Sequence, residues 1–223
     1  MKTINLAQPR LLKHSLMALA VLTMAFTLTP ARADVENDND GDDFTFALVR
    51  SGAALAANAL PNAQGWVHIE SVGPVEIMDV KVWGLPANTD FDFFVIQVPN
   101  APFGLAWYQG DIETNRNGVG YGRFIGRFSI ETFIMAPGVA QAPPDPFHDP
   151  HRIPDATQNP ATNPVQTYHL GLWFNSPQDA VKAGLPGTVT PFNGEHDAGL
   201  QALSTRQFPD AAGPLKKITT SGN

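Results

Sequence analysis

Four histidines stand where imidazole nitrogens could bind a transition metal. His148 and His151 are three residues apart beside Asp149 in a proline-rich stretch, and His169 and His196 follow later in the chain. Imidazole suits Zn and Cu, and a stable site needs further fixed ligands. The four histidines are therefore a candidate copper or zinc site, with ordinary loop and hydrogen-bonded core histidines as the alternative.

Carboxylates near His196 and on one predicted strand are the candidates for acid–base chemistry. Glu195 and Asp197 flank His196, which places an imidazole between two carboxylates. Asp111 and Glu113 alternate on one strand face, as a pair for glycoside hydrolysis could. Solvated side chains are the simpler interpretation of both groups. Because Gly-x-Ser-x-Gly, His-Glu-x-x-His and Ser-x-x-Lys motifs are absent, the sequence identifies no catalytic residue.

Aromatic side chains offer a different function, which is binding by stacking. Trp107, Tyr108, Tyr121 and Trp173 are spread over several predicted strands. Gathered on one sheet face, they would form a binding surface for a sugar ring or an apolar ligand. Pointing inward, they would belong to the core instead.

The composition excludes several classes of function. The 223 residues include 14 basic and 21 acidic residues and no cysteine. An acidic chain is a poor partner for nucleic acid, which is bound through Lys and Arg. Without cysteine there is no thiol catalysis, thiolate zinc site or iron–sulfur cluster. We therefore expect a small molecule, a glycan or a protein as the partner.

The first 33 residues have the layout of a secretory signal peptide. Lys2, Arg10 and Lys13 precede an apolar run over residues 16–28, and the small-residue triplet Ala31-Arg32-Ala33 follows. The run is too short to span a bilayer, and no later stretch is long and apolar enough to do so. We expect cleavage after Ala33 and a secreted protein, periplasmic or extracellular.

The remaining chain divides by composition into segments with different predicted structures. We expect an acidic, disordered N-terminus, a short helix or linker, a β-sandwich domain that contains a long proline-rich loop, and a flexible C-terminus. These segments span residues 34–43, 44–64, 65–214 (loop 137–164) and 215–223. Apolar residues at roughly helical spacing, ended by Pro61, indicate the helix.

The fold class follows from the spacing of turn residues between apolar runs in residues 65–214. Short runs rich in Val, Ile, Phe and Trp are bounded by Gly, Pro or Asn at intervals of roughly 8 to 12 residues. This spacing predicts an all-β, antiparallel β-sandwich, immunoglobulin-like or superoxide-dismutase-like. One short helix interrupts the strands, with Ser176 as its N-cap, Pro177 at its first position and Gly184 past its end.

Four blocks of this region resemble a family of secreted bacterial proteins to which no activity is assigned. They read GLPANTDFD (84–92), WYQGDIETN (107–115), YHLGLWFNSP (168–177) and TPFNGEH (190–196). A fainter resemblance is to superoxide-dismutase-like and CHRD-type sandwiches, in which a "GLP" loop leads into a strand. The dismutase strand carries a His-x-His copper motif, whereas residues 91–97 contain no histidine. The resemblance therefore implies the sandwich without the dismutase ligands.

The sequence thus predicts a secreted β-sandwich whose role is binding or surface interaction. The alternative is an exported metal-dependent enzyme that uses a histidine-based copper or zinc site.

Overall fold

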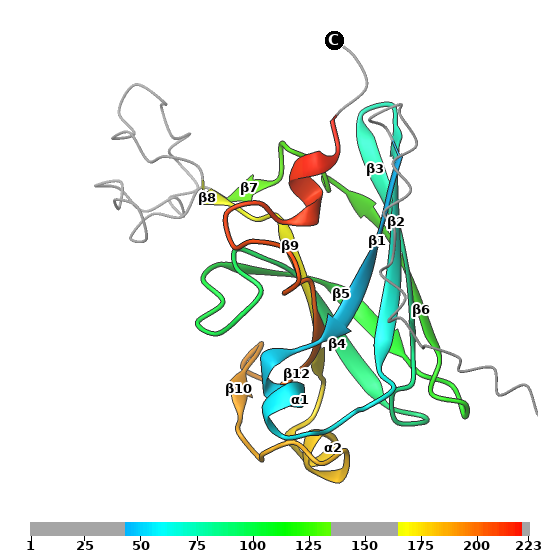
Figure 1. Ribbon diagram of the computed structural model, residues 1–223, viewed down its shortest axis with the longest axis vertical. Helices are drawn as coiled ribbons and strands as arrows, with labels where there is room; N and C mark the ends of the chain where they lie inside the picture. Colours follow the sequence, from blue (N-terminus) through cyan, green and yellow to red (C-terminus); the bar gives the residue numbers. More distant parts are fainter. Residues whose placement is uncertain (1–42, 135–164, 220–223) are drawn as a thin grey trace, which may run out of the picture. The chain divides into compact units, whose positions relative to one another are not determined.

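The computed structural model describes residues 43–134 and 165–219, which form twelve β-strands, two short α-helices and a 3₁₀-helix (Figure 1). The strands are β1 (Asp43–Arg50), β2 (Gln64–Val72), β3 (Val75–Trp83), β4 (Asp90–Ile96), β5 (Ala106–Glu113), β6 (Gly120–Gly126), β7 (Phe133–Ile134), β8 (Val165–Gln166), β9 (His169–Phe174), β10 (Thr190–Pro191), β11 (Asp197–Ala198) and β12 (Gln201–Ser204). The helices are α1 (Gly52–Ala56), α2 (Pro177–Lys182) and η1 (Pro214–Lys217).

Eight of the strands form one antiparallel sheet in the order β5-β4-β9-β12-β1-β2-β3-β6. Strand β1 pairs with β2 along its first six residues and with β12 through Val49 and Arg50, so it belongs to both halves of the sheet. The outermost strands, β5 and β6, follow one another in the chain and meet at a bridge between Thr114 and Gly120. The sheet therefore curls into a barrel-like sandwich, which confirms the predicted all-β antiparallel fold (Figure 1).

Alternation along the strands explains why the two layers close on a common core. Val67 and Ile69 of β2 and Phe91 and Phe93 of β4 are completely buried, and the residues between them point to the outer faces. Burial of each large apolar side chain stabilises the fold by roughly 1.5–3 kcal/mol. Strand β9 is buried along its whole length, because loops and a hairpin cover its outer face as well.

Helix α2 is where the sequence places it. The Ser176 hydroxyl accepts a hydrogen bond from the Asp179 backbone N–H at 3.1 Å, and Pro177 occupies the first turn. Gly184 follows the C-cap with φ of 90°, a left-handed conformation that glycine adopts without strain.

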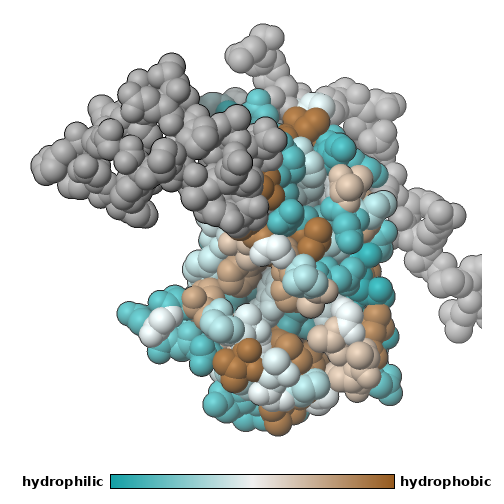
Figure 2. All heavy atoms as spheres, turned by 90° about the vertical axis from the view of Figure 1, so that its left-hand side faces the viewer, coloured by the Kyte–Doolittle hydropathy of each residue, from teal (hydrophilic) through white to brown (hydrophobic). Residues whose placement is uncertain are grey.

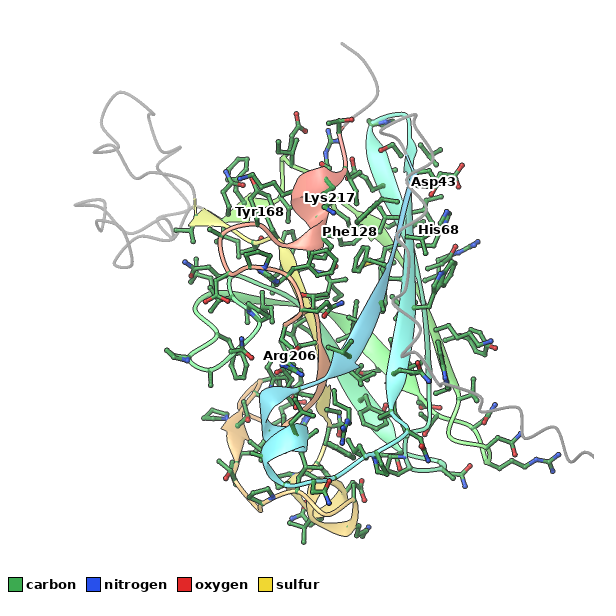
Figure 3. All side chains as sticks on the ribbon, in the orientation of Figure 1. Asp43, His68, Phe128, Tyr168, Arg206 and Lys217 are labelled. Atoms are coloured by element: carbon green, nitrogen blue, oxygen red, sulfur yellow. The ribbon has the colours of Figure 1, made fainter. Side chains whose placement is uncertain are left out.

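The predicted helix within residues 44–64 is wrong in its first half. Residues 43–50 form strand β1, in which Phe44, Phe46 and Leu48 face the core at alternate positions, and only the short helix α1 follows. Burial of every second side chain is the pattern of a strand, whereas a helix buries side chains three or four residues apart. On the outer face Asp43 and His68 of β2 point toward one another, with 2.6 Å between Oδ1 and Nε2 (Figure 3).

The predicted flexible C-terminus is also wrong for residues 215–218. Leu215 and Ile218 are completely buried, and the Ile218 carbonyl accepts a hydrogen bond from the Ile130 N–H at 2.9 Å. Phe128 and Tyr168 belong to the same end of the core, beside the helix that carries Lys217 (Figure 3). The tail is ordered because it supplies apolar surface that closes this end of the barrel.

Several predicted segments lie outside the described residues: the leader (1–33), the acidic N-terminus up to residue 42 and the proline-rich loop (137–164). Within residues 43–134 and 165–219, no helix has the length and apolar character needed to cross a membrane.

Candidate functional site

Three neighbouring strands place aromatic rings on one outer face of the barrel. Phe94 of β4 lies directly opposite Tyr108 of β5, and its ring centroid is 5.5 Å from the Tyr108 ring. The Phe94 ring also lies 5.3 Å from Trp173 of β9, in an edge-to-face arrangement. The Trp173 ring folds over Gly171, where a Cβ atom would lie only 2.3 Å from the ring. A glycine at this position therefore gives the indole its place on the face.

A loop and a hairpin build the rest of the site above this face. Residues 97–104 bring Phe103 to within 4.8 Å of the Trp173 ring, and the loop is held by the Gln97 side chain, which accepts the Leu105 N–H at 3.1 Å. The β10–β11 hairpin brings Phe192 to within 5.1 Å of the Tyr108 ring. Figure 2 views the side of the molecule on which this hairpin lies, where hydrophobic and hydrophilic side chains are interspersed.

These segments enclose a pocket of about 820 Å³, which we call the aromatic pocket. Five aromatic side chains line it, and the other lining residues are small or uncharged: Phe94, Phe103, Tyr108, Trp173 and Phe192, with Ala101, Pro102, Gly104, Ala106, Thr190, Pro191, Asn193 and Ala198. A volume of about 300–1,000 Å³ with mostly apolar walls is typical of sites for small organic ligands.

Four carboxylates form a second feature of the same sheet face, which we call the acidic row: Asp90, Asp92, Asp111 and Glu113. Asp92 lies opposite Asp111, and Asp90 opposite Glu113, across the β4–β5 pair. The Tyr108 hydroxyl donates a hydrogen bond to Asp111 Oδ1 at 2.5 Å, which joins the row to the pocket wall. Facing residues of an antiparallel pair have Cβ atoms about 5 Å apart, so the like charges repel one another.

The burial of Asp92 makes its carboxyl unusual. The side chain is completely buried, and burial, together with the negative charges of Asp111 and Asp90, raises its pKa to about 6. The Asn175 amide, which donates to Oδ1 at 3.0 Å, and the nearby His196 act in the opposite direction. Partial burial also raises the pKa of Asp90, and the charges of Asp111 and Glu113 add to that shift.

Polar atoms without an internal partner gather beside Asp92. Asp92 Oδ2, Trp173 Nε1 and Gln201 Nε2 are buried and make no hydrogen bond among the described residues. Their residues are register neighbours on the adjacent strands β4, β9 and β12. Buried polar atoms are nearly always paired in folded proteins, so three unpaired atoms in one row set this face apart from the ordinary core.

The predicted histidine site receives no support from the described residues. His169 is completely buried, its two ring nitrogens lie 3.0 Å from Thr205 Oγ1 and 3.1 Å from the Asp210 carbonyl oxygen, and burial lowers its pKa. Neither nitrogen is free for a metal. His196 is exposed beside the Phe192 ring, at 4.9 Å. The described parts of the chain hold no group of three or more His, Cys, Asp or Glu suited to a metal, and His148 and His151 lie outside them.

The four predicted aromatic residues divide between three places. Tyr108 and Trp173 line the aromatic pocket. Trp107 is 49% exposed at the edge strand β5, where it pairs with Val95 on the side of the sheet opposite the pocket. Tyr121 is 64% exposed on β6, in the other layer. The three phenylalanines of the pocket were not predicted from the sequence, although Phe192 stands in one of the quoted sequence blocks.

No protein-family model matches this chain, and no curated protein is significantly similar to it. The resemblance to a family of secreted bacterial proteins therefore stays a prediction, and the function has to be argued from the site.

Proposed function

We propose that this chain is an exported binding protein that holds a small organic ligand in the aromatic pocket. The observation that carries the proposal is the convergence of five aromatic side chains on one pocket of about 820 Å³. They come from three strands, a loop and a hairpin, and pack against one another at centroid distances of 4.8–5.8 Å. The leader-like residues 1–33 support export.

The pocket favours a ligand with an apolar body and few polar groups. Its aromatic walls offer ring faces and edges for stacking, while the Tyr108 hydroxyl, Thr190 and Asn193 supply hydrogen-bonding groups at its border. Each wall is held by other contacts, such as the bond from Thr190 Oγ1 to the Gly199 carbonyl at 2.8 Å. A wall that is already in place loses little conformational entropy when a ligand binds.

A thermal-shift screen of small molecules tests this proposal on protein purified from cells that express the full-length chain. A ligand at about a hundred times its Kd stabilises the fold by about 2.7 kcal/mol. For a domain of this size that corresponds to a rise in Tm of about 5–10 °C. We expect such hits with the wild type.

Two variants locate the binding site. Ala106→Trp fills the pocket from an exposed position on β5, so molecules that stabilise the wild type should no longer stabilise this variant. Tyr121→Ala removes an exposed ring from the other layer, and the same molecules should stabilise this variant as they do the wild type. Hits that stabilise Ala106→Trp as strongly as the wild type would show that the ligand binds elsewhere and would refute the proposal.

A further inference from the structure

Several carboxylates lie on the strands and the hairpin that form the aromatic pocket. Among the described residues that line the pocket, none is Lys or Arg. Asp111 is bonded to the pocket residue Tyr108, and the opposite strand carries Asp92 and Asp90. Glu195 and Asp197 stand in the hairpin that supplies Phe192. Carboxylates near a cleft with apolar walls produce a negative potential inside it, which attracts cations and repels anions.

Aromatic rings add a specific attraction for organic cations. An ammonium group over a ring face is attracted by the negative face of the π system, and cages of several rings bind quaternary ammonium groups. This chain already uses such contacts on its surface. The Lys81 ammonium lies 5.5 Å from the centroid of the Tyr121 ring, and the Lys217 ammonium lies 5.2 Å from that of Phe44. Both of these rings lie outside the pocket.

Two other charge classes fit the pocket less well. An organic anion would be repelled by the carboxylates behind Tyr108, and the described lining residues include no Lys or Arg to compensate. A bare metal ion needs a cluster of ligating side chains, and the described residues hold none. An apolar ligand with a positive charge would contact the rings and be attracted by the carboxylates that lie behind Tyr108.

Resting on the proposed function of the aromatic pocket, we infer that its ligand is an organic cation, an amine or a quaternary ammonium compound with an apolar body. The rings contact the alkyl groups that surround the positive charge, and the acidic row supplies the opposite charge behind them. The acidic row thereby selects the ligand by its charge.

The test compares choline with its neutral isostere, in which a tert-butyl group replaces the trimethylammonium group. Both are titrated into the wild-type protein and followed by NMR, because single small probes of this kind bind weakly. We expect choline to bind at least about tenfold more tightly than the isostere. The preference should shrink as salt is raised, since ions screen the carboxylates.

Variants assign the preference to residues. Asp111→Asn keeps an oxygen that accepts the Tyr108 hydroxyl and removes one charge, so choline affinity should fall several-fold while the affinity of the isostere is unchanged. Glu70→Gln removes an exposed carboxylate from β2 in the other layer and serves as the matched control. It should change neither affinity.

Three results overturn the inference, and they separate it from the proposed function. Equal or tighter binding of the isostere, abolished by Ala106→Trp, leaves the pocket as a binding site and removes the cation. Choline binding that Ala106→Trp does not reduce places the cation site elsewhere. Absence of binding by both probes also overturns the inference. The thermal-shift screen then tests separately whether the pocket binds a small organic ligand.

Discussion

Replacing Asp92 by Asn should stabilise the protein, and the gain should depend on pH. The carboxyl is completely buried, and its pKa of about 6 in the folded state compares with 3.8 for a free aspartate side chain. Asn175 donates to Oδ1, and the asparagine side chain keeps an oxygen in that place. The substitution therefore removes the negative charge and little else.

The sign and size of the effect follow from the linkage between proton binding and folding. Because the pKa is raised on folding, the folded state binds the proton more tightly than the unfolded state does. This contribution to stability is fully present below about pH 4 and is lost as the pH rises through about 6. A shift of about two pKa units corresponds to at most about 3 kcal/mol. The free energy of unfolding of Asp92→Asn should therefore exceed that of the wild type by up to about 3 kcal/mol at pH 7.5 and by almost nothing at pH 4.

Urea unfolding at pH 4, 5.5 and 7.5 measures the difference between the two free energies of unfolding at each pH. Asp79→Asn provides a control of opposite sign. Arg123 donates two hydrogen bonds to Asp79, at 2.6 and 2.7 Å, which lower the pKa of that carboxyl. This variant should lose stability at pH 7.5 and lose less at pH 4. A stability difference between Asp92→Asn and the wild type that does not grow from pH 4 to pH 7.5 would refute the reasoning.

Three further predictions concern the site and the chain ends. Gly171→Ala places a Cβ atom 2.3 Å from the Trp173 ring, so it should destabilise the fold by about 1–3 kcal/mol in urea and weaken any pocket ligand in the same titration. His169→Ala removes the bond between the buried imidazole and Thr205 Oγ1, and it leaves the Asp210 carbonyl without its imidazole partner. The loss should cost about 2–4 kcal/mol, whereas a metal assay should give the same result for variant and wild type. Mass spectrometry of protein exported from cells should show Asp34 as the first residue.

The strands could be predicted wherever their alternation was visible. Val67 and Ile69 alternate with polar neighbours, and the structure has β2 there. Strand β1 shows the same period in Phe44, Phe46 and Leu48, yet the following alanines suggested a helix that begins too early. Pairing with β2 and β12 outweighs a weak local preference for helix, and that pairing is not visible in the segment itself.

The pocket could be predicted only in part, because long-range contacts assemble it. Tyr108 and Trp173 are visible in the sequence as aromatic residues on predicted strands, but the position of Phe192 depends on a hairpin folded over a distant sheet face. The acidic row depends on register. A bulge in β5 near Gly110, which has φ of 147°, allows both Tyr108 and Asp111 to face the pocket side of the sheet. Composition and spacing contain no signal for that offset.

The buried carboxylate connects the stability of the fold to the proposed ligand. A cation in the pocket favours the ionised form of Asp92, so by reciprocity a proton on Asp92 weakens the binding of the cation. Choline affinity should therefore fall between pH 7.5 and pH 5. Asp111, His196 and Asp90 also act on this carboxyl, so Asp92→Asn is needed to isolate the part due to Asp92. If Asp92→Asn gains stability at pH 7.5 and loses choline affinity at the same pH, the carboxylate is destabilising to the fold and favourable to the proposed ligand.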